Sequence, residues 1–133
     1  MPDRIASLYR ARIAGERGTV RKNWGGRISV ALAYPNSYRV GMSNLGLQVV
    51  YRLLNLREHV VAERFFLPEG PEMSLHEEGG RGIVSLESLS PLHRFDLVAF
   101  SLSFENDYPS ILKILDLARL PLLAEERDDA CPL

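Results

Sequence analysis

The hydrophobic positions of the chain fall into long apolar runs and helical stripes that alternate along the sequence. Residues 28–34 (ISVALAY) are almost continuously apolar, and 96–104 (DLVAFSLSF) show a similar run later in the chain. Runs of this kind are typical of strands that are buried on both faces of a parallel sheet. Residues 59–67 predict a further strand between them, with Glu63 and Arg64 inside it as a local charge pair.

Helical periodicity follows the first and the last of these runs. After a loop over 36–42, Ser43 is expected to cap a helix that continues to about Leu56. Its apolar stripe predicts a face that lies on the sheet. The stripe consists of Leu45, Val49, Leu53 and Leu56, with Val50 and Leu54 beside it. A second helix is expected to end near Leu120, with Pro109 in its first turn.

Two segments show less of this alternation. Residues 1–27 form a basic arm, expected to be solvated and loosely ordered, with a helix over 4–13. Trp24, the single tryptophan, is predicted to anchor the arm on the domain. Residues 68–82 are rich in glycine, proline and acidic side chains, so a polar loop with a solvated His76 is expected there.

The order strand, helix, strand, loop, strand, helix predicts the fold class. Strands that alternate with helices imply right-handed crossovers and a parallel sheet. We therefore expect a three-layer, Rossmann-like (flavodoxin-like) α/β domain over 28–133, with strand order 2-1-3. Pro132-Leu133 looks like the start of another strand, so the domain is interpreted as truncated. A truncated sheet leaves an unpaired edge, which predicts a dimer of this chain.

Composition and charge narrow the classes of function. With 46% hydrophobic residues and a net charge of −1, the chain is typical of a globular domain and lacks the basic excess of a general nucleic-acid binder. The basic arm leaves a contact with RNA or another anionic substrate open. A single cysteine, Cys131, excludes a disulfide framework and fits a cytoplasmic location. No apolar run is long enough for a membrane span.

Candidate ligand contacts lie in the loops that follow the first and third strands. Ligands of open α/β sheets bind at the carboxyl ends of the strands, which places residues 35–46 and 101–107 beside one crevice. Gly41 and Gly46 match neither a Walker A loop nor G-x-G-x-x-G, so a nucleotide-binding flavodoxin-like protein is disfavoured. Glu105 and Asp107 at the end of the third strand are candidates for a binding pair, but a role in capping the last helix is favoured.

The run Asn36-Ser37-Tyr38-Arg39-Val40-Gly41 resembles the D-x-H-x-x-G loop of cobalamin-binding domains. In that family the histidine ligates cobalt, and here its position is Tyr38, while Asn36 stands for the aspartate. A second family signature, S-x-L, falls on Ser101 to Ser103, with Ser103 in place of the leucine. The blocks YPNSYRVGMSNLG, LLN, AERFF, SLES and FSLSFE together resemble the N-terminal, cobalamin-binding-like domain of an uncharacterised bacterial family of radical S-adenosylmethionine (radical SAM) proteins.

The resemblance implies an accessory domain that positions cofactor or substrate for a C-terminal radical SAM domain with S-adenosylmethionine and a [4Fe–4S] cluster. This chain alone is not expected to be an enzyme, because one cysteine cannot hold the cluster. Two alternatives stay open: cobalamin bound without a protein ligand to cobalt, or a structural docking module that binds no ligand. The cofactor-binding candidates are Asn36, Tyr38, Gly41, Ser43 and Ser101.

Overall fold

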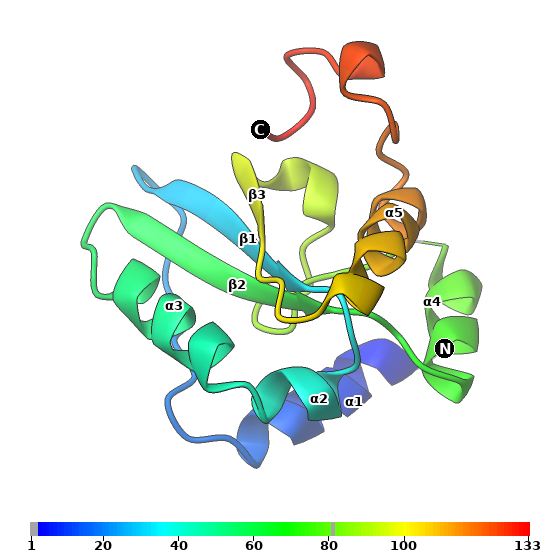
Figure 1. Ribbon diagram of the computed structural model, residues 1–133. Helices are drawn as coiled ribbons and strands as arrows, with labels where there is room; N and C mark the ends of the chain where they lie inside the picture. Colours follow the sequence, from blue (N-terminus) through cyan, green and yellow to red (C-terminus); the bar gives the residue numbers. More distant parts are fainter. Residues whose placement is uncertain (1–2, 81) are drawn as a thin grey trace.

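The computed structural model describes residues 3–80 and 82–133. Its centre is a parallel sheet with the order β2-β1-β3, as predicted (Figure 1). β1 (Ile28–Tyr34) pairs with β2 (Val60–Phe66) along its whole length and with β3 (Leu97–Phe100) over its carboxyl half. The third strand is therefore shorter than the apolar run that predicted it.

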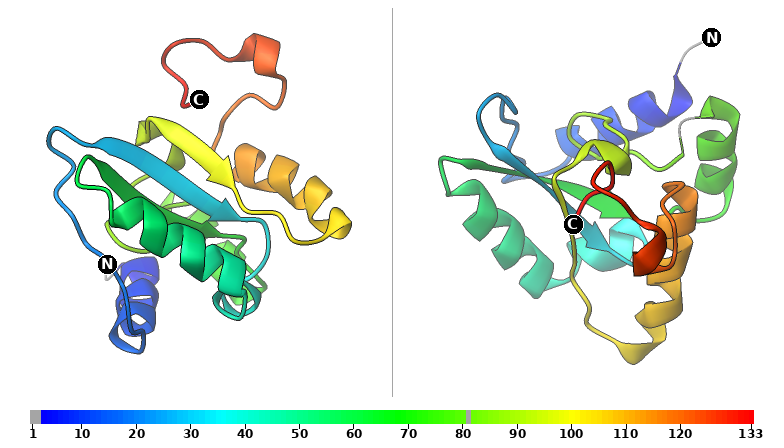
Figure 2. Two further views of the ribbon diagram at one scale, coloured as in Figure 1. Left: turned by 60° about the vertical axis from the view of Figure 1, so that its left-hand side comes forward. Right: turned by 90° about the horizontal axis from the view of Figure 1, so that it is seen from above.

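Helices cover both faces of this sheet, which makes the three predicted layers (Figure 2). One face carries α1 (Arg4–Ala14) and α3 (Leu45–Asn55), and the other carries α5 (Tyr108–Leu117). Two shorter helices, α2 (Tyr38–Met42) and α4 (Pro71–Gly79), flank the sheet. Across the described ranges, no helix has the length and hydropathy to cross a membrane.

Two hydrophobic cores meet at β1, one on each face. Val30, Leu32 and Tyr34 pack with α1 and α3, whereas Ala31 and Ala33 pack with α5. Successive side chains of a strand point to opposite faces. A strand with helices on both sides must therefore be apolar at nearly every position, which is why residues 28–34 predicted this strand correctly.

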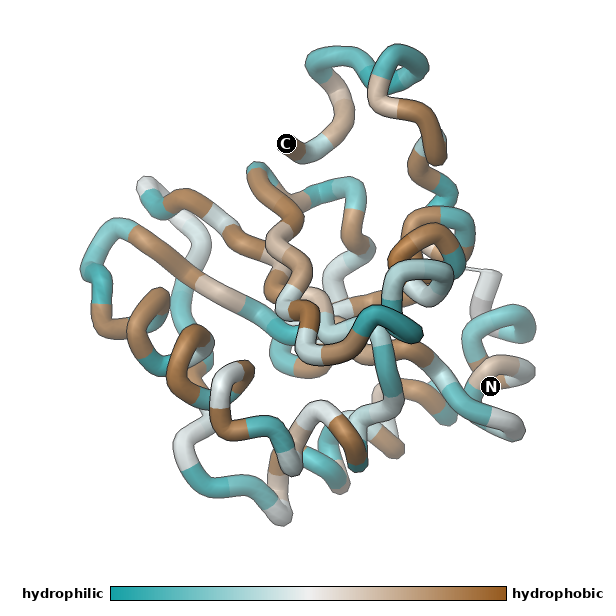
Figure 3. Tube along the Cα trace, viewed as in Figure 1, coloured by the Kyte–Doolittle hydropathy of each residue, from teal (hydrophilic) through white to brown (hydrophobic). Residues whose placement is uncertain are grey.

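The orientation of α3 differs from the prediction. The expected stripe faces away from the sheet, with Leu45 77% and Leu53 57% exposed; Figure 3 shows how apolar this helix is. The buried face carries Leu47, Tyr51 and Asn55 instead. Asn55 fixes this rotation, because its amide exchanges two hydrogen bonds with the backbone of Ala62 in β2, at 3.0 and 3.1 Å.

Two segments predicted as loops contain helices. α2 lies inside the expected loop 36–42, and α4 lies inside 68–82, where Pro71 occupies a first-turn position that tolerates proline. His76, predicted to be solvated, is buried at 4% exposure, and its Nε2 lies 3.2 Å from the Tyr9 hydroxyl. The face of α4 that carries His76 thus packs against α1.

The basic arm is docked on the domain rather than loosely ordered. α1 confirms the predicted helix, and Trp24 anchors the segment that follows, with its Nε1 donating to Glu63 at 2.9 Å and its ring against Phe95. Lys22 donates to three backbone carbonyls near the end of α3 and the start of β2. Several cationic side chains of the arm therefore make hydrogen bonds within the domain.

The last residue described pairs with the outer edge of β3. Leu133 donates to the carbonyl of Asp96 at 3.1 Å and accepts from the amide of Val98 at 2.8 Å. This is the hydrogen-bond pattern of a parallel strand pair. The interpretation of Pro132-Leu133 as the approach to a strand agrees with it, while truncation and dimerisation stay predictions.

Candidate functional site

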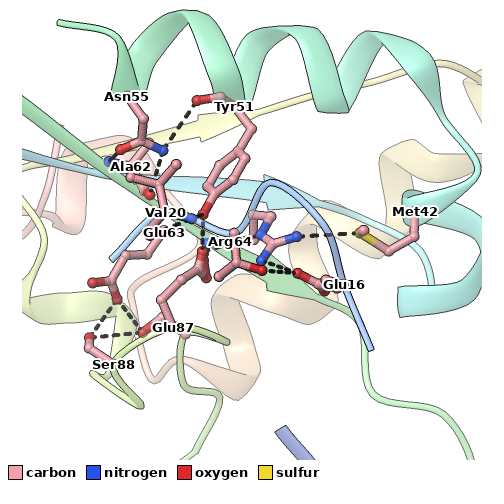
Figure 4. Close-up of polar contacts among 12 residues, drawn as sticks. Glu16, Val20, Met42, Tyr51, Asn55, Ala62, Glu63, Arg64, Glu87 and Ser88 are labelled. Atoms are coloured by element: carbon pink, nitrogen blue, oxygen red, sulfur yellow. Dashed lines mark hydrogen bonds and ion pairs between the residues drawn. The ribbon is translucent and has the colours of Figure 1, made fainter. Parts of the chain in front are cut away.

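A buried ionic cluster joins the arm to the sheet (Figure 4). Arg64, 2% exposed, pairs through Nη2 with Glu16 at 2.7 Å and through Nε with Glu87 at 3.2 Å. Its guanidinium also lies 4.4 Å from the centre of the Tyr51 ring. Glu63 contacts Trp24, Ser85 and Ser88 instead. The predicted Glu63–Arg64 pair is wrong, because neighbouring residues of a strand point to opposite faces.

Burial and partners set the charges in this cluster. Burial raises the pKa of Glu87 to about 7, against the opposing effect of Arg64. Burial also acts on Glu16, but hydrogen bonds from Arg64, Tyr38 and Thr19 outweigh it and lower the pKa of Glu16. Each carboxylate oxygen of these two residues has a hydrogen-bond partner within the protein. The cluster is thus satisfied internally and holds the arm in place.

The candidate ligand site lies elsewhere, at the carboxyl ends of β1 and β3. Here the β1–α2 connection and the β3–α5 connection run side by side (Figure 1). Asn36 donates to Oδ1 of Asp107 at 3.3 Å, and Asn44 donates to Oγ of Ser103 at 2.8 Å. In the strand order β2-β1-β3, the connections that follow β1 and β3 leave the sheet in opposite directions. The place between these two strand ends is the switch point of the sheet, which is the usual position of a ligand in open α/β sheets.

Asp107 departs from its predicted role. It occupies the N-cap position of α5, but its side chain makes no capping hydrogen bond. The residue is 5% exposed. Oδ1 accepts from Asn36, whereas Oδ2 has no hydrogen-bond partner among residues 3–80 and 82–133. A buried polar atom without a partner is costly and is typical of sites that take up a ligand, ion or water.

Of the predicted site residues, Asn36 alone bridges the two connections. Its Oδ1 also accepts from the amide of Ser37, and its carbonyl accepts from Leu67. Ser101 is half-buried, and its amide continues the pairing with β1 by donating to the carbonyl of Ala33. These two residues lie at the strand ends, as the sequence predicted.

Tyr38 turns toward the docked arm. Its hydroxyl donates to Glu16, its ring meets Phe66 edge to face at 5.2 Å, and Arg12 lies 4.5 Å above the ring centre. Burial, together with the hydrogen bond to the Glu16 carboxylate, raises the pKa of Tyr38. The phenol therefore has a partner inside the domain.

Gly41 and Ser43 have local structural roles. A side chain at Gly41 would collide with the ring of Phe66, so the glycine lets α2 approach β2 closely. Ser43 ends α2 and donates from Oγ to Arg39 at 2.9 Å. The expected cap of α3 is wrong by one residue, because Asn44 accepts from Leu47 at 2.9 Å instead.

The sequence pattern predicted neither the contact of Asn44 with Ser103 nor that of Asn36 with Asp107. Asn44 carried a recognisable signal, since asparagine is as good an N-cap as serine. Its amide group can then reach across to the second connection while its oxygen caps α3. No local pattern reports such a contact between residues 59 positions apart.

Metal chemistry has little support in the part of the chain that the structure describes. No group of three histidine, cysteine, aspartate or glutamate side chains that could hold a metal ion occurs there. The single cysteine cannot ligate an iron–sulfur cluster, which needs several thiolates. The residues present therefore do not fit a [4Fe–4S] group.

A cavity of about 690 Å³ opens between the C-terminal segment and the 93–96 region. Its lining includes His93, Asp96 and Arg127. It lies at the amino end of β3, the opposite end of the sheet from the usual ligand position of this architecture. The carboxyl ends of the strands remain the better candidate.

The fold and these contacts define a class: an open parallel α/β domain with polar connections that meet at the switch point of its sheet. Residues 46–133 match the family described as radical SAM proteins, N-terminal, and the chain belongs to this family. The match begins after the β1–α2 connection, so it includes Ser101 and Asp107 but excludes Asn36 and Tyr38. No curated protein and no solved structure matches the chain significantly.

Proposed function

We propose that this chain is an N-terminal accessory domain that holds a cofactor or substrate at the carboxyl ends of β1 and β3 for a radical SAM domain of the same protein. Family membership supports the accessory role and the association with a radical SAM domain. The observation that carries the ligand-holding role is a pair of hydrogen bonds, Asn36–Asp107 and Asn44–Ser103. They join the segment between β1 and α3 to the β3–α5 connection.

Cobalamin is the cofactor that the resemblance of residues 36–41 suggests. The surroundings of Tyr38 argue against a protein ligand to cobalt, because the phenol is held by Glu16 and carries a raised pKa. The polar groups of the crevice fit the periphery of the cofactor better, since amides and hydroxyls there can donate to carboxylate and serine oxygens. The form proposed is therefore cobalamin bound without a lower protein ligand.

Titration with hydroxocobalamin tests this proposal directly. We expect binding by equilibrium dialysis, and we expect Asn36→Ala to weaken it. Tyr38→Phe should leave affinity unchanged, because the hydroxyl points to Glu16. Absence of binding to the wild-type chain, both alone and joined to its radical SAM domain, would refute the cofactor role.

A docking module without a ligand is the second candidate. It is favoured by one specific observation, the apolar outer face of α3, where Leu45, Val49, Leu53 and Leu56 are all exposed. Exposed apolar patches are typical of interaction surfaces. Replacing Leu53 by Gln should then weaken association with the radical SAM domain in a pull-down of the two separated parts.

Contact of the arm with RNA stays a prediction without a supporting observation. Arg12, Lys22 and Arg27 make contacts within the domain. This leaves fewer cations for an external anion than the sequence suggested.

A further inference from the structure

Asp107 combines three properties that a purely structural carboxylate rarely has together. It is buried, with only 5% of its surface exposed. Its Oδ2 has no partner within the described ranges 3–80 and 82–133. It also lies beside Asn36 at the switch point of the sheet, which is the expected ligand position.

The chemistry of this group limits what can satisfy it. A carboxylate accepts hydrogen bonds and repels anions, so Oδ2 suits an O–H or N–H donor and not a phosphate. The described residues offer no group of three histidine, cysteine, aspartate or glutamate side chains, so a metal ion here would need most of its ligands from water or from a bound molecule. The required partner is thus a hydrogen-bond donor carried by a small molecule or by water.

Two aromatic side chains flank Asp107 along the chain and remain in contact with solvent. Phe104 is 62% exposed and Tyr108 is 60% exposed. Exposed aromatic rings beside a polar group are typical of surfaces on which a planar heterocycle stacks. A molecule that combines a planar base with a hydroxyl-bearing sugar matches both features, and this combination defines a nucleoside.

We propose that Asp107 accepts, through Oδ2, a hydrogen bond from a ribose hydroxyl of a nucleoside or of a cofactor that contains one. The inference rests on the proposed ligand-holding function and names a residue and a ligand class for it. Asn36 donates to Oδ1 and thereby holds the carboxylate, while Oδ2 is left without a partner among the described residues. Two sources carry this chemistry: an adenine nucleoside and the nucleotide tail of cobalamin.

Binding measurements with adenosine, 2′,3′-dideoxyadenosine and hydroxocobalamin test the proposal. Loss of a hydrogen bond to a charged group corresponds to a decrease in affinity of about tenfold or more. We expect the wild-type chain to bind adenosine about tenfold more tightly than the dideoxy compound, and Asp107→Asn to remove this preference. If cobalamin is the source, the wild-type chain binds hydroxocobalamin instead, and Asp107→Asn weakens that binding about tenfold.

Glu105→Gln is the matched control, because it removes a neighbouring carboxylate that is exposed to solvent. It should leave each affinity within about twofold of the wild type. Equal binding of the two adenosine compounds by the wild-type chain, with hydroxocobalamin affinity unchanged in Asp107→Asn, would overturn the role of Asp107 while the ligand-holding function stands. Failure of the wild-type chain to bind any of the three, both alone and joined to its radical SAM domain, would refute the nucleoside inference together with the cofactor role. The nucleoside comparison needs no variant and decides the adenine nucleoside source by itself. If Asp107→Asn does not fold, Asp107→Ser replaces it in the hydroxocobalamin measurement, with the same expected loss of about tenfold.

Discussion

Two groups of buried carboxylates in this domain are organised in opposite ways. In the ionic cluster, the oxygens of Glu16 and Glu87 all have partners from the protein itself. At the switch point, Asp107 has one bonded oxygen and one without a partner in the described ranges. A group that is satisfied internally stabilises the fold, whereas a group that is half satisfied at a ligand position costs stability until a partner arrives.

Polar residues are buried inside this small α/β domain for one of two reasons: they stabilise the fold, or they bind a ligand. Burial alone does not distinguish them, since Arg64, Glu87 and Asp107 are all buried. The hydrogen-bond partners of each polar atom distinguish the two roles. Substitutions in the cluster should therefore change stability, and substitutions at the switch point should change binding.

The largest effect is expected for Arg64→Met. Removal of one partner from a buried ion pair leaves uncompensated charge and costs about 3–5 kcal/mol. Glu16 and Glu87 both lose a hydrogen-bonded cation, and the arm loses one of its attachments to β2. Urea denaturation measures the change. Arg52→Met on the exposed surface of α3 is the control and should stay within about 0.5 kcal/mol of the wild type.

The pH dependence of the cluster gives the second largest effect. The pKa of Glu87 is raised from 4.5 to about 7, so the folded state holds this proton more tightly than the unfolded state. Its favourable contribution is complete below pH 4.5 and is lost as the pH rises through about 7. The free energy of unfolding of the wild type, relative to Glu87→Gln, should fall by at most about 3 kcal/mol over this interval. A difference that stays constant or rises with pH would contradict the assignment.

The sheet was predictable because its signal is local. A strand between two helical layers needs apolar residues at nearly every position, and residues 28–34 supply them. The alternation of strands and helices then restricts the strand order. The prediction of β2 succeeded even though Glu63 and Arg64 interrupt its apolar run, since each side chain finds partners on its own face.

The rotation of α3 was not predictable from its stripe. The helix has apolar residues on more than one face, and polar contacts decide which face is buried. Asn55 bonds to the backbone of Ala62, and Tyr51 bonds to Glu87 and Val20. Those partners lie on other elements, so the sequence pattern of the helix cannot report them.

The proximity of the two polar loops was predictable, but the contacts between them only in part. The rule that ligands bind at strand carboxyl ends placed both connections correctly beside each other. The interpretation of Asp107 as a cap failed because α5 begins with Pro109 in its first turn and receives no side-chain cap. The pairing of Asp107 with Asn36 joins residues 71 positions apart, which only the folded chain shows.

Gly41 gives a smaller effect and tests whether a predicted ligand residue is structural. Gly41→Ala places a methyl group against the ring of Phe66, and overpacking of this kind costs about 1–3 kcal/mol. Gly46→Ala is the matched control, because its methyl group meets only the side chain of Asn44, at 3.1 Å. The control should stay within about 1 kcal/mol of the wild type. Equal melting temperatures for the two variants would show that α2 can move away from β2.

The smallest change in stability is expected for Asp107→Asn, and it is the sharpest distinction between the two groups. The substitution keeps the shape and removes a buried charge that lacks one partner. The free energy of unfolding without ligand should therefore be unchanged or should rise by about 1 kcal/mol or less. A loss well beyond 1 kcal/mol would place Asp107 with Arg64, as part of the scaffold. Stability that is retained while nucleoside binding is lost would instead show that this carboxylate serves the ligand.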